Sequence, residues 1–274
     1  MGIPDSVMPH VRRFGFSGLA AVALVVVMLL GVNPITLLSG KVAPPPAITA
    51  QTGPAAIKAG TATTGDYLQT VATEANTLWT NVFYIASVQY IKAPLIGVAT
   101  SREFGCGMAG SSVGTFYCPE DGTIYVDMSS YDGLRASSPD VADHAQAYRV
   151  ARSYGHHVQQ TLGLLEAFAK SRDGMDEAEQ IRHEKQLSAQ ADCYAGIWAS
   201  TVGLVGMLDN PALVTAIDAS SAGQPVVRIP SRQGLEVPET FAEADSASRK
   251  EWFDKGYAIP AGGTCTLTKI PLPA

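Results

Sequence analysis

Apolar residues recur every three or four positions in four segments of the chain, which is the spacing of helices with one buried face. The first segment covers residues 66–83, and Asp66 is suited to cap its amino terminus. The fourth covers residues 245–256, where we expect Trp252 and Phe253 to pack inward. The buried face of the first helix is formed by Leu68, Val71, Ala75, Leu78, Trp79 and Val82.

Two longer helices are expected between these segments. One begins at Ser138 or Asp140, where Ser-Pro-Asp is typical of a helix start, and Gly163 is suited to end it. A polar stretch over residues 171–186 then leads into the next helix. The buried stripes consist of Ala147, Ala151, Tyr154, Val158 and Leu162 in one helix and of Leu187, Ala191, Tyr194 and Trp198 in the other.

A β-hairpin is expected between the first two helices. The strings VGTFYC at 113–118 and TIYVDM at 123–128 are rich in strand-forming residues. Pro119, Asp121 and Gly122 lie between them, and these residue types favour a tight turn. We therefore expect two antiparallel strands joined by this turn.

An uncharged apolar run occupies residues 14–32. Its length approaches the ~20 residues that a helix needs to cross a bilayer. Arg12 and Arg13 precede it, so the positive-inside rule places the amino terminus in the cytoplasm and the rest of the chain outside. A cleaved signal peptide is the alternative, but its apolar core is typically about 7–15 residues long and ends at a small-x-small site. The following NPITLLSG has no clean site of that kind, so we expect an uncleaved anchor.

Composition divides the rest of the chain. The segment after the apolar run is rich in Ala, Pro, Thr and Gly and has almost no large apolar residue, which is typical of a spacer that does not fold alone. The expected organisation is a cytoplasmic amino terminus at 1–13, a transmembrane anchor at 14–32, a linker at 33–65 and an extracytoplasmic domain at 66–274.

Charge and cysteine content limit the class of protein. The formal net charge is -6, which argues against a nucleic-acid partner, because such surfaces are basic. All four cysteines follow the apolar run, on the oxidising side of the membrane. They permit three pairings, of which Cys106 with Cys118 would close a short loop and Cys193 with Cys265 would tie the end of the chain to a helix. Buried free thiols are the alternative, and no CxxC spacing indicates a zinc–cysteine site.

Four strings of the sequence carry a family resemblance. They are AYRVARSYGHHVQQTLG at 147–163, AQADCYAGIWA at 189–199, FYCPEDGTIYVDM at 116–128 and Arg249-x-x-Trp252-Phe253-x-x-Gly256. Together they resemble the bacterial neutral zinc metallopeptidase-like family, whose members are often membrane-anchored and whose two helices read HExGHHVQ and ELQADCxAG. The resemblance implies a zincin-like α+β fold that is mostly helical, with a small sheet or hairpin over the active-site helix.

The resemblance also implies a zinc site with three protein ligands. Two His four residues apart bind Zn²⁺ from one helical face, the Glu after the first His is the base for the zinc-bound water, and a Glu on the second helix is the third ligand. In this chain the first ligand falls on Arg152, the base on Ser153, the second ligand on His156 and the third on Ser188. Asp192, which supports a ligand His in the family, is retained.

These replacements predict a degenerate site. Arg is permanently protonated and Ser supplies neither the charge nor the basicity of Glu, so only His156 remains of the three ligands. We therefore expect no resident cofactor, although active relatives use zinc. A rearranged site that joins His156 and Asp192 to His144 or to His183 is the alternative; His183 lies in a polar run, where we expect it to be exposed.

A structural role is expected for the residues that remain. His156 and His157 are expected to satisfy hydrogen bonds in the core. Arg152 is expected to pair with Asp192 across the two helices and to fill the zinc position with a fixed cation, because a buried carboxylate without a partner is costly. The alternative is an Arg152 on the surface and an Asp192 bound by N–H groups.

Three functions remain open for this sequence, and whether it is an enzyme is uncertain. The first is an inactive, membrane-anchored homologue that binds a peptide or protein of the cell envelope in the former cleft, with strand 123–128 as the docking edge. The second is an active metallopeptidase with a rearranged metal site, and the third is a structural envelope protein whose cleft is closed. An open groove beside the hairpin would favour binding, and a filled one would favour structure. The possible cleft residues are His156, His157, Asp192, Tyr125 and Asp127.

Overall fold

The computed structural model describes residues 64–98, 102–104, 106–109, 114–128, 139–201, 235–258 and 265–266. The expected anchor at 14–32 lies outside these ranges, as does nearly all of the expected linker. Within them, no helix is long and apolar enough to span a membrane. The anchor and the division of the chain around it therefore stay predictions.

All four predicted helices are present, together with two further elements. The helices are α3 (Thr64–Ile85), α5 (Pro139–Thr161), α7 (Glu177–Thr201) and α9 (Ser246–Tyr257), and the additions are α6 (Leu164–Arg172) and the 3-10 turn η1 (Pro238–Thr240). The predicted apolar stripes face the core, although Leu78, Val82, Leu162 and Trp252 are only partly buried.

A glycine and a pair of capping residues explain why α6 forms and why α7 begins earlier than predicted. Gly163 has a φ of 72°, a left-handed conformation open to glycine, so α5 stops there and α6 starts in a new direction. Asp176 and Glu179 then cap each other: the Glu179 N–H donates to Asp176 Oδ1 (2.8 Å), and the Asp176 N–H donates to Glu179 Oε2 (3.3 Å). The polar stretch therefore forms the first, largely exposed turns of α7.

The main sheet has three strands in the order β1-β5-β4. The predicted hairpin consists of β4 (Thr115–Cys118) and β5 (Thr123–Asp127), which are antiparallel, and β1 (Leu95–Val98) pairs with the other side of β5 in parallel. A separate antiparallel pair is formed by β2 (Arg102–Phe104) and β3 (Gly107–Ala109). The mixed sheet and the long helices confirm an α+β architecture that is mostly helical.

The prediction that strand 123–128 offers a docking edge is wrong. β5 is hydrogen-bonded on both sides, by β1 and by β4, so its backbone groups have no free side for a peptide. The hairpin pattern alone gave no sign of β1, whose four residues pair with β5 from a distant position in the chain. Among the described strands, β4 forms the edge on the hairpin side of the sheet.

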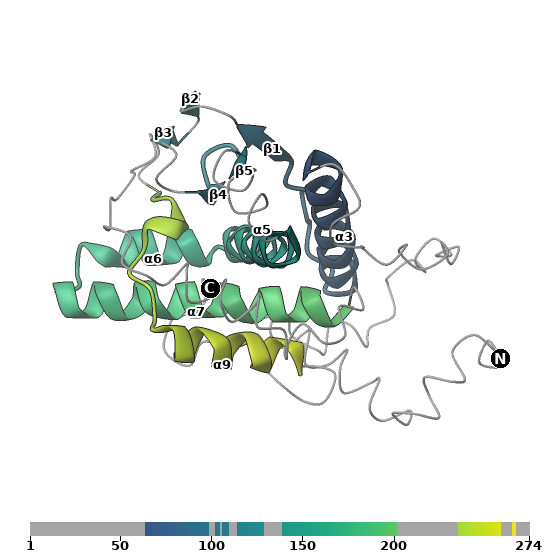
Figure 1. Cartoon of the computed structure of the whole chain (residues 1–274). Helices are drawn as coiled ribbons and strands as arrows, with labels where there is room; N and C mark the ends of the chain where they lie inside the picture. The colour runs from purple at the N-terminus through teal and green to yellow at the C-terminus, as the bar shows by residue number, and fades with distance from the viewer. Residues whose placement is uncertain are drawn as a thin grey trace, which may run out of the picture.

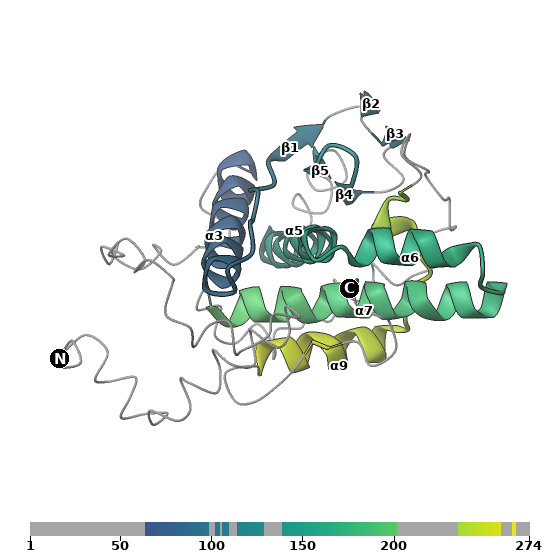
Figure 2. The same cartoon turned by 180° about the vertical axis from the view of Figure 1, so that it is seen from behind.

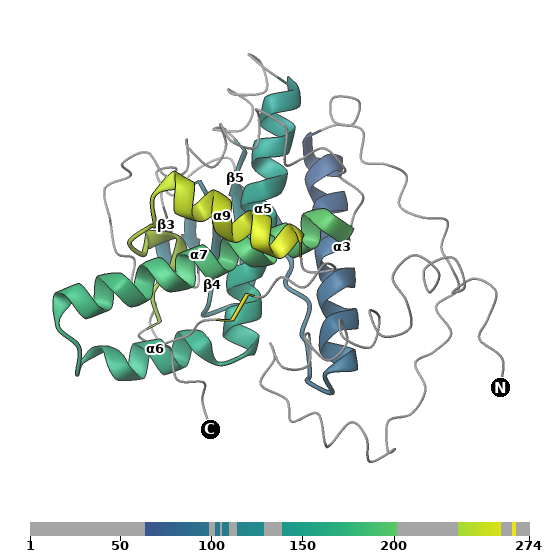
Figure 3. The ribbon, with the colours of Figure 1, turned by 90° about the horizontal axis from the view of Figure 1, so that it is seen from below.

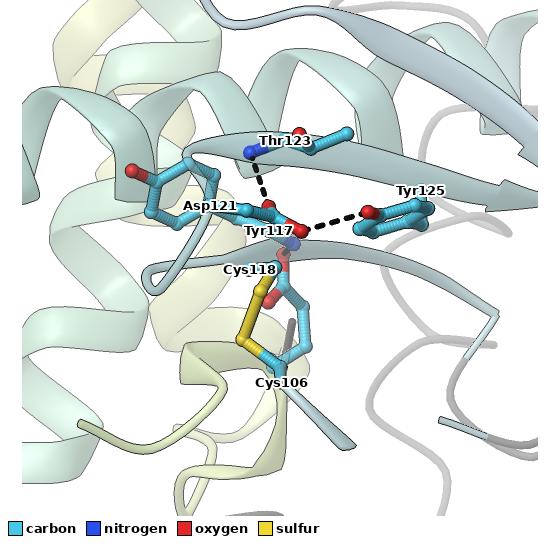
Figure 4. Close-up of a disulfide and its surroundings, with 7 residues drawn as sticks. Cys106, Tyr117, Cys118, Asp121, Thr123 and Tyr125 are labelled. Atoms are coloured by element: carbon cyan, nitrogen blue, oxygen red, sulfur yellow. Dashed lines mark hydrogen bonds between the residues drawn. A yellow bond between two sulfur atoms is a disulfide. The ribbon is translucent and has the colours of Figure 1, made fainter. Parts of the chain in front are cut away.

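The hairpin turn is held by one carboxylate and one disulfide, both drawn in Figure 4. The Thr123 N–H donates to Asp121 Oδ1 (2.9 Å), and the Tyr125 hydroxyl donates to Asp121 Oδ2 (2.8 Å). At the end of β4, Cys118 is bonded to Cys106, with their Cα atoms 5.7 Å apart. The turn is therefore anchored on both of its strands.

A second disulfide joins Cys193 in the middle of α7 to Cys265 near the end of the chain. Of the three pairings that the sequence permits, the structure thus has Cys106 with Cys118 and Cys193 with Cys265, and no described cysteine is a free thiol. The Gln190 side chain also donates to the Cys265 carbonyl oxygen (2.9 Å), so the chain end is held on α7 by two contacts.

The elements are arranged in layers around α5. The sheet lies on one side of α5, α7 lies on the other, and α9 lies beyond α7 (Figures 1 and 2). α3 packs against α5 and β1. Figure 3 shows that α5 crosses α7 steeply, whereas α9 crosses α7 at a shallower angle. α5 is therefore covered on several sides, and polar side chains on it are buried as well as apolar ones.

Two glycines permit the close approach of the three helices that carry the site. A Cβ atom at Gly155 on α5 would lie 2.8 Å from the Ala191 carbonyl oxygen of α7. A Cβ atom at Gly256 on α9 would lie 1.8 Å from the Cys193 carbonyl oxygen of α7. No side chain fits at either distance, so these crossings set how closely side chains on α5, α7 and α9 can meet.

Gly256→Ala should lower the free energy of unfolding by roughly 2 kcal/mol or more, because its methyl group would push the backbones of α7 and α9 apart. Urea unfolding followed by circular dichroism measures the change. Gly65→Ala on α3 is the matched control, because a Cβ atom there meets nothing within 4 Å, and its effect should stay within about 1 kcal/mol. Equal stability of the two variants would contradict the close packing.

Candidate functional site

The positions of the family's zinc ligands come together where α5 crosses α7. Arg152 and His156 lie one turn apart on the same face of α5, and Ser188 and Asp192 lie one turn apart on α7. All four residues are buried; Arg152 is 5% exposed and the other three are 0% exposed. The four residues that the family resemblance singles out are therefore close together in the structure, and their side chains decide what this place can do.

Arg152 occupies the position of the first zinc ligand and spans the gap between the helices. Its Nε donates to Asp192 Oδ1 (3.0 Å), and its Nη2 donates to Ser188 Oγ (2.6 Å). The same Nη2 lies 3.1 Å from Glu243 Oε1, in the segment before α9. The predicted pair of Arg152 with Asp192 is confirmed, and the alternative of a surface arginine is wrong.

A second arginine, Arg249 on α9, enters the site from the far side of α7. Its Nε and Nη2 donate to the two Asp192 oxygens (3.0 and 3.2 Å), and its Nη1 donates to Glu243 Oε2 (2.7 Å). Tyr148 on α5 donates its hydroxyl proton to Asp192 and accepts from Arg249 Nη2 (2.8 Å). The sequence places Arg249 in one of the family strings, but no pattern in it predicts that this side chain joins Asp192.

We call the group formed by Arg152, Arg249, Asp192, Glu243 and Tyr148 the arginine cluster. Within it, two guanidinium groups face two carboxylates. Burial disfavours a charged guanidinium, but Glu243 and Asp192 outweigh that effect and raise the pKa of Arg152 above its ordinary value. The same carboxylates, with Tyr148, raise the pKa of Arg249 despite its burial. Both arginines therefore stay charged, and each carboxylate is bound by both of them.

Ser153, at the position of the catalytic Glu, contacts a different carboxylate. Its hydroxyl donates to Glu239 Oε1 (2.6 Å), and the same oxygen accepts the Tyr117 N–H of β4 (2.9 Å). Glu239 lies in residues 235–243, which we call the strap. Burial raises the pKa of Glu239 to about 7, although Ser153, Arg152 and the Tyr117 N–H each act to lower it.

His156 is the one zinc ligand of the family that this chain retains, and only one of its two ring nitrogens is hydrogen-bonded. Its Nδ1 lies 2.8 Å from Gln159 Oε1, and Nε2 is buried with no hydrogen-bond partner. Burial, followed by the charge of nearby Arg152, lowers the pKa of His156 well below its ordinary value. The imidazole is therefore neutral, and the expectation that hydrogen bonds satisfy it is met at Nδ1 but not at Nε2.

His157 fulfils the same expectation at both ring nitrogens. Its Nε2 donates to the Ile91 carbonyl oxygen (2.7 Å), so its Nδ1 accepts from the Tyr117 hydroxyl (3.0 Å). Burial lowers the pKa of His157, which favours this neutral form. The ring therefore links α5 to β4 and to the segment before β1, and it faces away from the arginine cluster.

The remaining candidate residues do not join the arginine cluster through any contact described here. Tyr125 is buried in a small cluster with Phe116, Cys106, Cys118 and Val237. Asp127 is buried at the end of β5. The place of Tyr125 and Asp127 in a cleft therefore stays a prediction.

The two histidines of the alternative metal site also lie apart. His183 is half-buried rather than exposed, because its ring stacks on Phe168 of α6 at 6.2 Å between ring centroids. His144 is half-buried three turns before His156 on α5. Asp192, which the rearranged site would also need, is bound by both arginines.

The side chains at this position do not fit a zinc ion held by the family's ligand set. A guanidinium stands where the first imidazole would bind, and it is hydrogen-bonded to the serine that replaces the third ligand. Among the residues that the structure describes, no three His, Cys, Asp or Glu side chains are grouped so that they could hold a metal ion. Of the atoms that bind zinc in the family, only His156 Nε2 is present, and it is buried without a hydrogen-bond partner. The charge of nearby Arg152 disfavours a second cation at this atom.

Comparison with known proteins agrees with the strings and the geometry. The family described as "Putative neutral zinc metallopeptidase" matches residues 6–267, which is nearly the whole chain. The chain therefore belongs to this family. No solved structure matches it.

Curated relatives are similar over the same part of the chain. The "Uncharacterized protein YpfJ" of Escherichia coli (strain K12) is 34% identical over 180 residues, which cover 65% of this chain and 62% of that protein. The "Uncharacterized protein Rv2575" of Mycobacterium tuberculosis (strain ATCC 25618 / H37Rv) is 34% identical over 173 residues, or 59% of this chain and 57% of that protein. The matched region thus spans less than two thirds of each relative.

Asp192→Asn should lower the free energy of unfolding by about 3–5 kcal/mol, because it leaves two buried guanidinium groups with one carboxylate fewer. Lys250→Ala on the neighbouring α9 is the control. It removes an ion pair with Asp254 of similar length (2.7 Å) whose side chains are 37% and 41% exposed, so its loss should be under about 1 kcal/mol. Urea titrations at neutral pH measure both, and an Asp192→Asn loss no larger than that of the control would show that the cluster does not carry stability.

Proposed function

We propose that this chain is a catalytically inactive member of the neutral zinc metallopeptidase family, held at the outer face of a membrane by residues 14–32. One observation carries the inactivity: Arg152, at the position of the first zinc ligand, is bound to Asp192, Ser188 and Glu243. A permanent cation with three partners cannot be exchanged for Zn²⁺ without dismantling the cluster.

The position of the catalytic base supports the same proposal. Ser153 donates its proton to Glu239 and is 1% exposed, so it has neither the basicity nor the access to activate a water molecule. An active metallopeptidase with a rearranged site would need another set of ligands. Asp192, His144 and His183 do not form one, because Asp192 is already paired, His183 stacks on Phe168 of α6, and the described part of the chain holds no group of three possible metal ligands.

A closed cleft favours a structural role in the cell envelope over peptide binding. The strap lies beside β4, where its Glu239 carboxylate takes the Tyr117 N–H that an added peptide strand would use. Glu243, also in the strap, pairs with both Arg152 and Arg249 of the arginine cluster. A peptide or protein ligand would have to displace the strap, so we assign the role of this protein to its outer surface.

The proposed location rests on the sequence and on the cysteines. The apolar run at 14–32 has the length of an anchor, and both disulfides lie beyond it. Disulfides are typical of proteins outside the cytoplasm, because the cytosol keeps thiols reduced. These observations support an extracytoplasmic domain on a membrane anchor.

Zinc content tests the inactivity directly. The full-length chain, purified without chelator and measured by plasma mass spectrometry, should contain far less than one zinc per chain, and it should cleave no peptide in a chelator-sensitive way. The combined variant Arg152→His, Ser153→Glu and Ser188→Glu restores the family's ligands and base, so it should take up about one zinc per chain.

The variant Arg152→Ala, Ser153→Ala and Ser188→Ala is the matched control, because it removes the arginine without adding ligands and should stay free of zinc. Stoichiometric zinc in the natural chain would overturn the proposal. A folded restoration variant without zinc would mean that the cleft has changed beyond these three positions.

The anchor gives a separate prediction. The full-length chain should stay with the membrane fraction after an alkaline carbonate wash, and deletion of residues 1–32 should release it into the soluble fraction. The intact mass of the mature protein distinguishes the two sequence-based alternatives, because a cleaved signal peptide removes the apolar run. A mature protein that lacks residues 14–32 would contradict the anchor.

A further inference from the structure

The strap is tied to four different helices and to the sheet. Glu236 pairs with Arg172 of α6 (2.8 Å), and the Ala242 N–H donates to Glu184 Oε2 of α7 (2.9 Å). Glu239 binds β4 and α5, and Glu243 binds the arginines of α5 and α9, as described above. In Figures 1 and 2 the strap is the yellow-green segment that leads from the sheet side of the molecule to α9.

Apolar contacts hold the strap at two further points. Val237 is fully buried in the small cluster beside the Cys106–Cys118 disulfide, on the β4 side of the sheet. Phe241 is buried against Phe168 of α6, with 5.6 Å between ring centroids. Glu239 lies between these two anchors, in the η1 turn, so its carboxylate is the polar contact at the centre of the strap.

Glu239 is the contact of the strap that is least well satisfied. Its Oε1 accepts from Tyr117 and Ser153, but its Oε2 is buried and has no hydrogen-bond partner. A carboxylate that loses its proton in this place puts charge on a buried oxygen that nothing stabilises. The other two carboxylates of the strap, Glu236 and Glu243, each face a guanidinium.

We propose that the strap is a proton-dependent latch over the edge of β4, closed while Glu239 carries a proton and loosened when that proton is lost. The direction of this pH dependence follows from the burial of Glu239 Oε2. The pKa of Glu239 is about 7 in the closed strap, and a released Glu239 returns to the ordinary pKa of about 4.5. Opening therefore releases a proton, and closure is favoured at low pH and weakened as the pH rises toward 7.

Several other titratable groups face Glu239 or the strap. They are Arg152, His157, Tyr117, Glu166, Glu236 and Glu243. Arg152 stays charged, and burial raises the pKa of the Tyr117 hydroxyl far above neutrality. His157 would act in the opposite direction, because burial lowers its pKa and its protonation at low pH would break the contact with Tyr117. Glu166 accepts a hydrogen bond from Gln160 at Oε1, but its Oε2 is buried without a hydrogen-bond partner, so the Glu239→Gln variant is what separates the two carboxyl groups.

Hydrogen exchange at the Tyr117 amide tests the latch in the full-length chain. That amide is protected by Glu239, so its protection factor, corrected for the intrinsic pH dependence of exchange, reports how often the strap opens. It should fall roughly tenfold per pH unit between about pH 5 and 7 and then level off. Amides in the middle of α7 should not follow this fall, which separates opening of the strap from global unfolding.

Variants assign the effect to one side chain. Glu239→Gln cannot lose a proton, so the protection of the Tyr117 amide should become independent of pH. Glu236→Gln, the matched control in the same strap, should keep the natural profile. Ser153→Ala removes a hydrogen bond that lowers the pKa of Glu239, so the pH at which protection levels off should rise. This variant tests the latch even if Glu239→Gln does not fold.

Three results would overturn the latch. They are a corrected protection factor that does not change with pH in the natural chain, an unchanged slope in Glu239→Gln, and protection that rises with pH, which would point to His157. The zinc content of the protein has no part in any of these outcomes, so the latch and the proposed inactivity stand or fall separately.

Discussion

The buried carboxylate of Asp192 is the contact on which the other parts of the site depend. It lies on α7 between two crossing helices and accepts hydrogen bonds from Arg152 and Tyr148 of α5 and from Arg249 of α9. An ionised carboxylate in such a place is costly unless it is surrounded by donors, and an arginine left alone there would be equally costly. The cluster is therefore stable only as a set, and it joins the three helices that glycine contacts bring close together.

Under the proposed function, the arginine cluster accounts for how the fold persists without a metal ion. A zinc site places a cation among side chains of α5 and α7, and Arg152 supplies a cation that is covalently part of α5. The planar guanidinium can bind several oxygens at once, which suits it to a position surrounded by Asp192, Ser188 and Glu243. The two arginines thus balance the charge of Asp192 without a metal ion.

The strap connects this cluster to the edge of the sheet. Glu243 is bound by the two arginines, and four residues earlier Glu239 reaches Ser153 and the backbone of β4. The replacements at the former ligand and base positions are thus both engaged by the same short segment. Under the proposed function, closure of the cleft and loss of the metal site are parts of one rearrangement.

Much of the architecture follows from local patterns in the sequence. The periodic apolar positions predict α3, α5, α7 and α9, because a helix must bury one face wherever it packs, and the turn residues predict the β4–β5 hairpin. The short helix α6 was missed because Gly163 redirects the chain instead of ending the helical stretch, and β1 was missed because four residues carry little periodicity.

The sequence alone determined which residues stand at the ligand positions, and therefore that an arginine and two serines replace groups that bind and activate. It also predicted the pair of Arg152 with Asp192, since helical spacing places both on facing sides. Only the tertiary structure decided the rest: Arg249, Glu243 and Glu239 come from segments about 50 to 100 residues away in the chain, and no local pattern reveals which distant side chain will satisfy a buried charge.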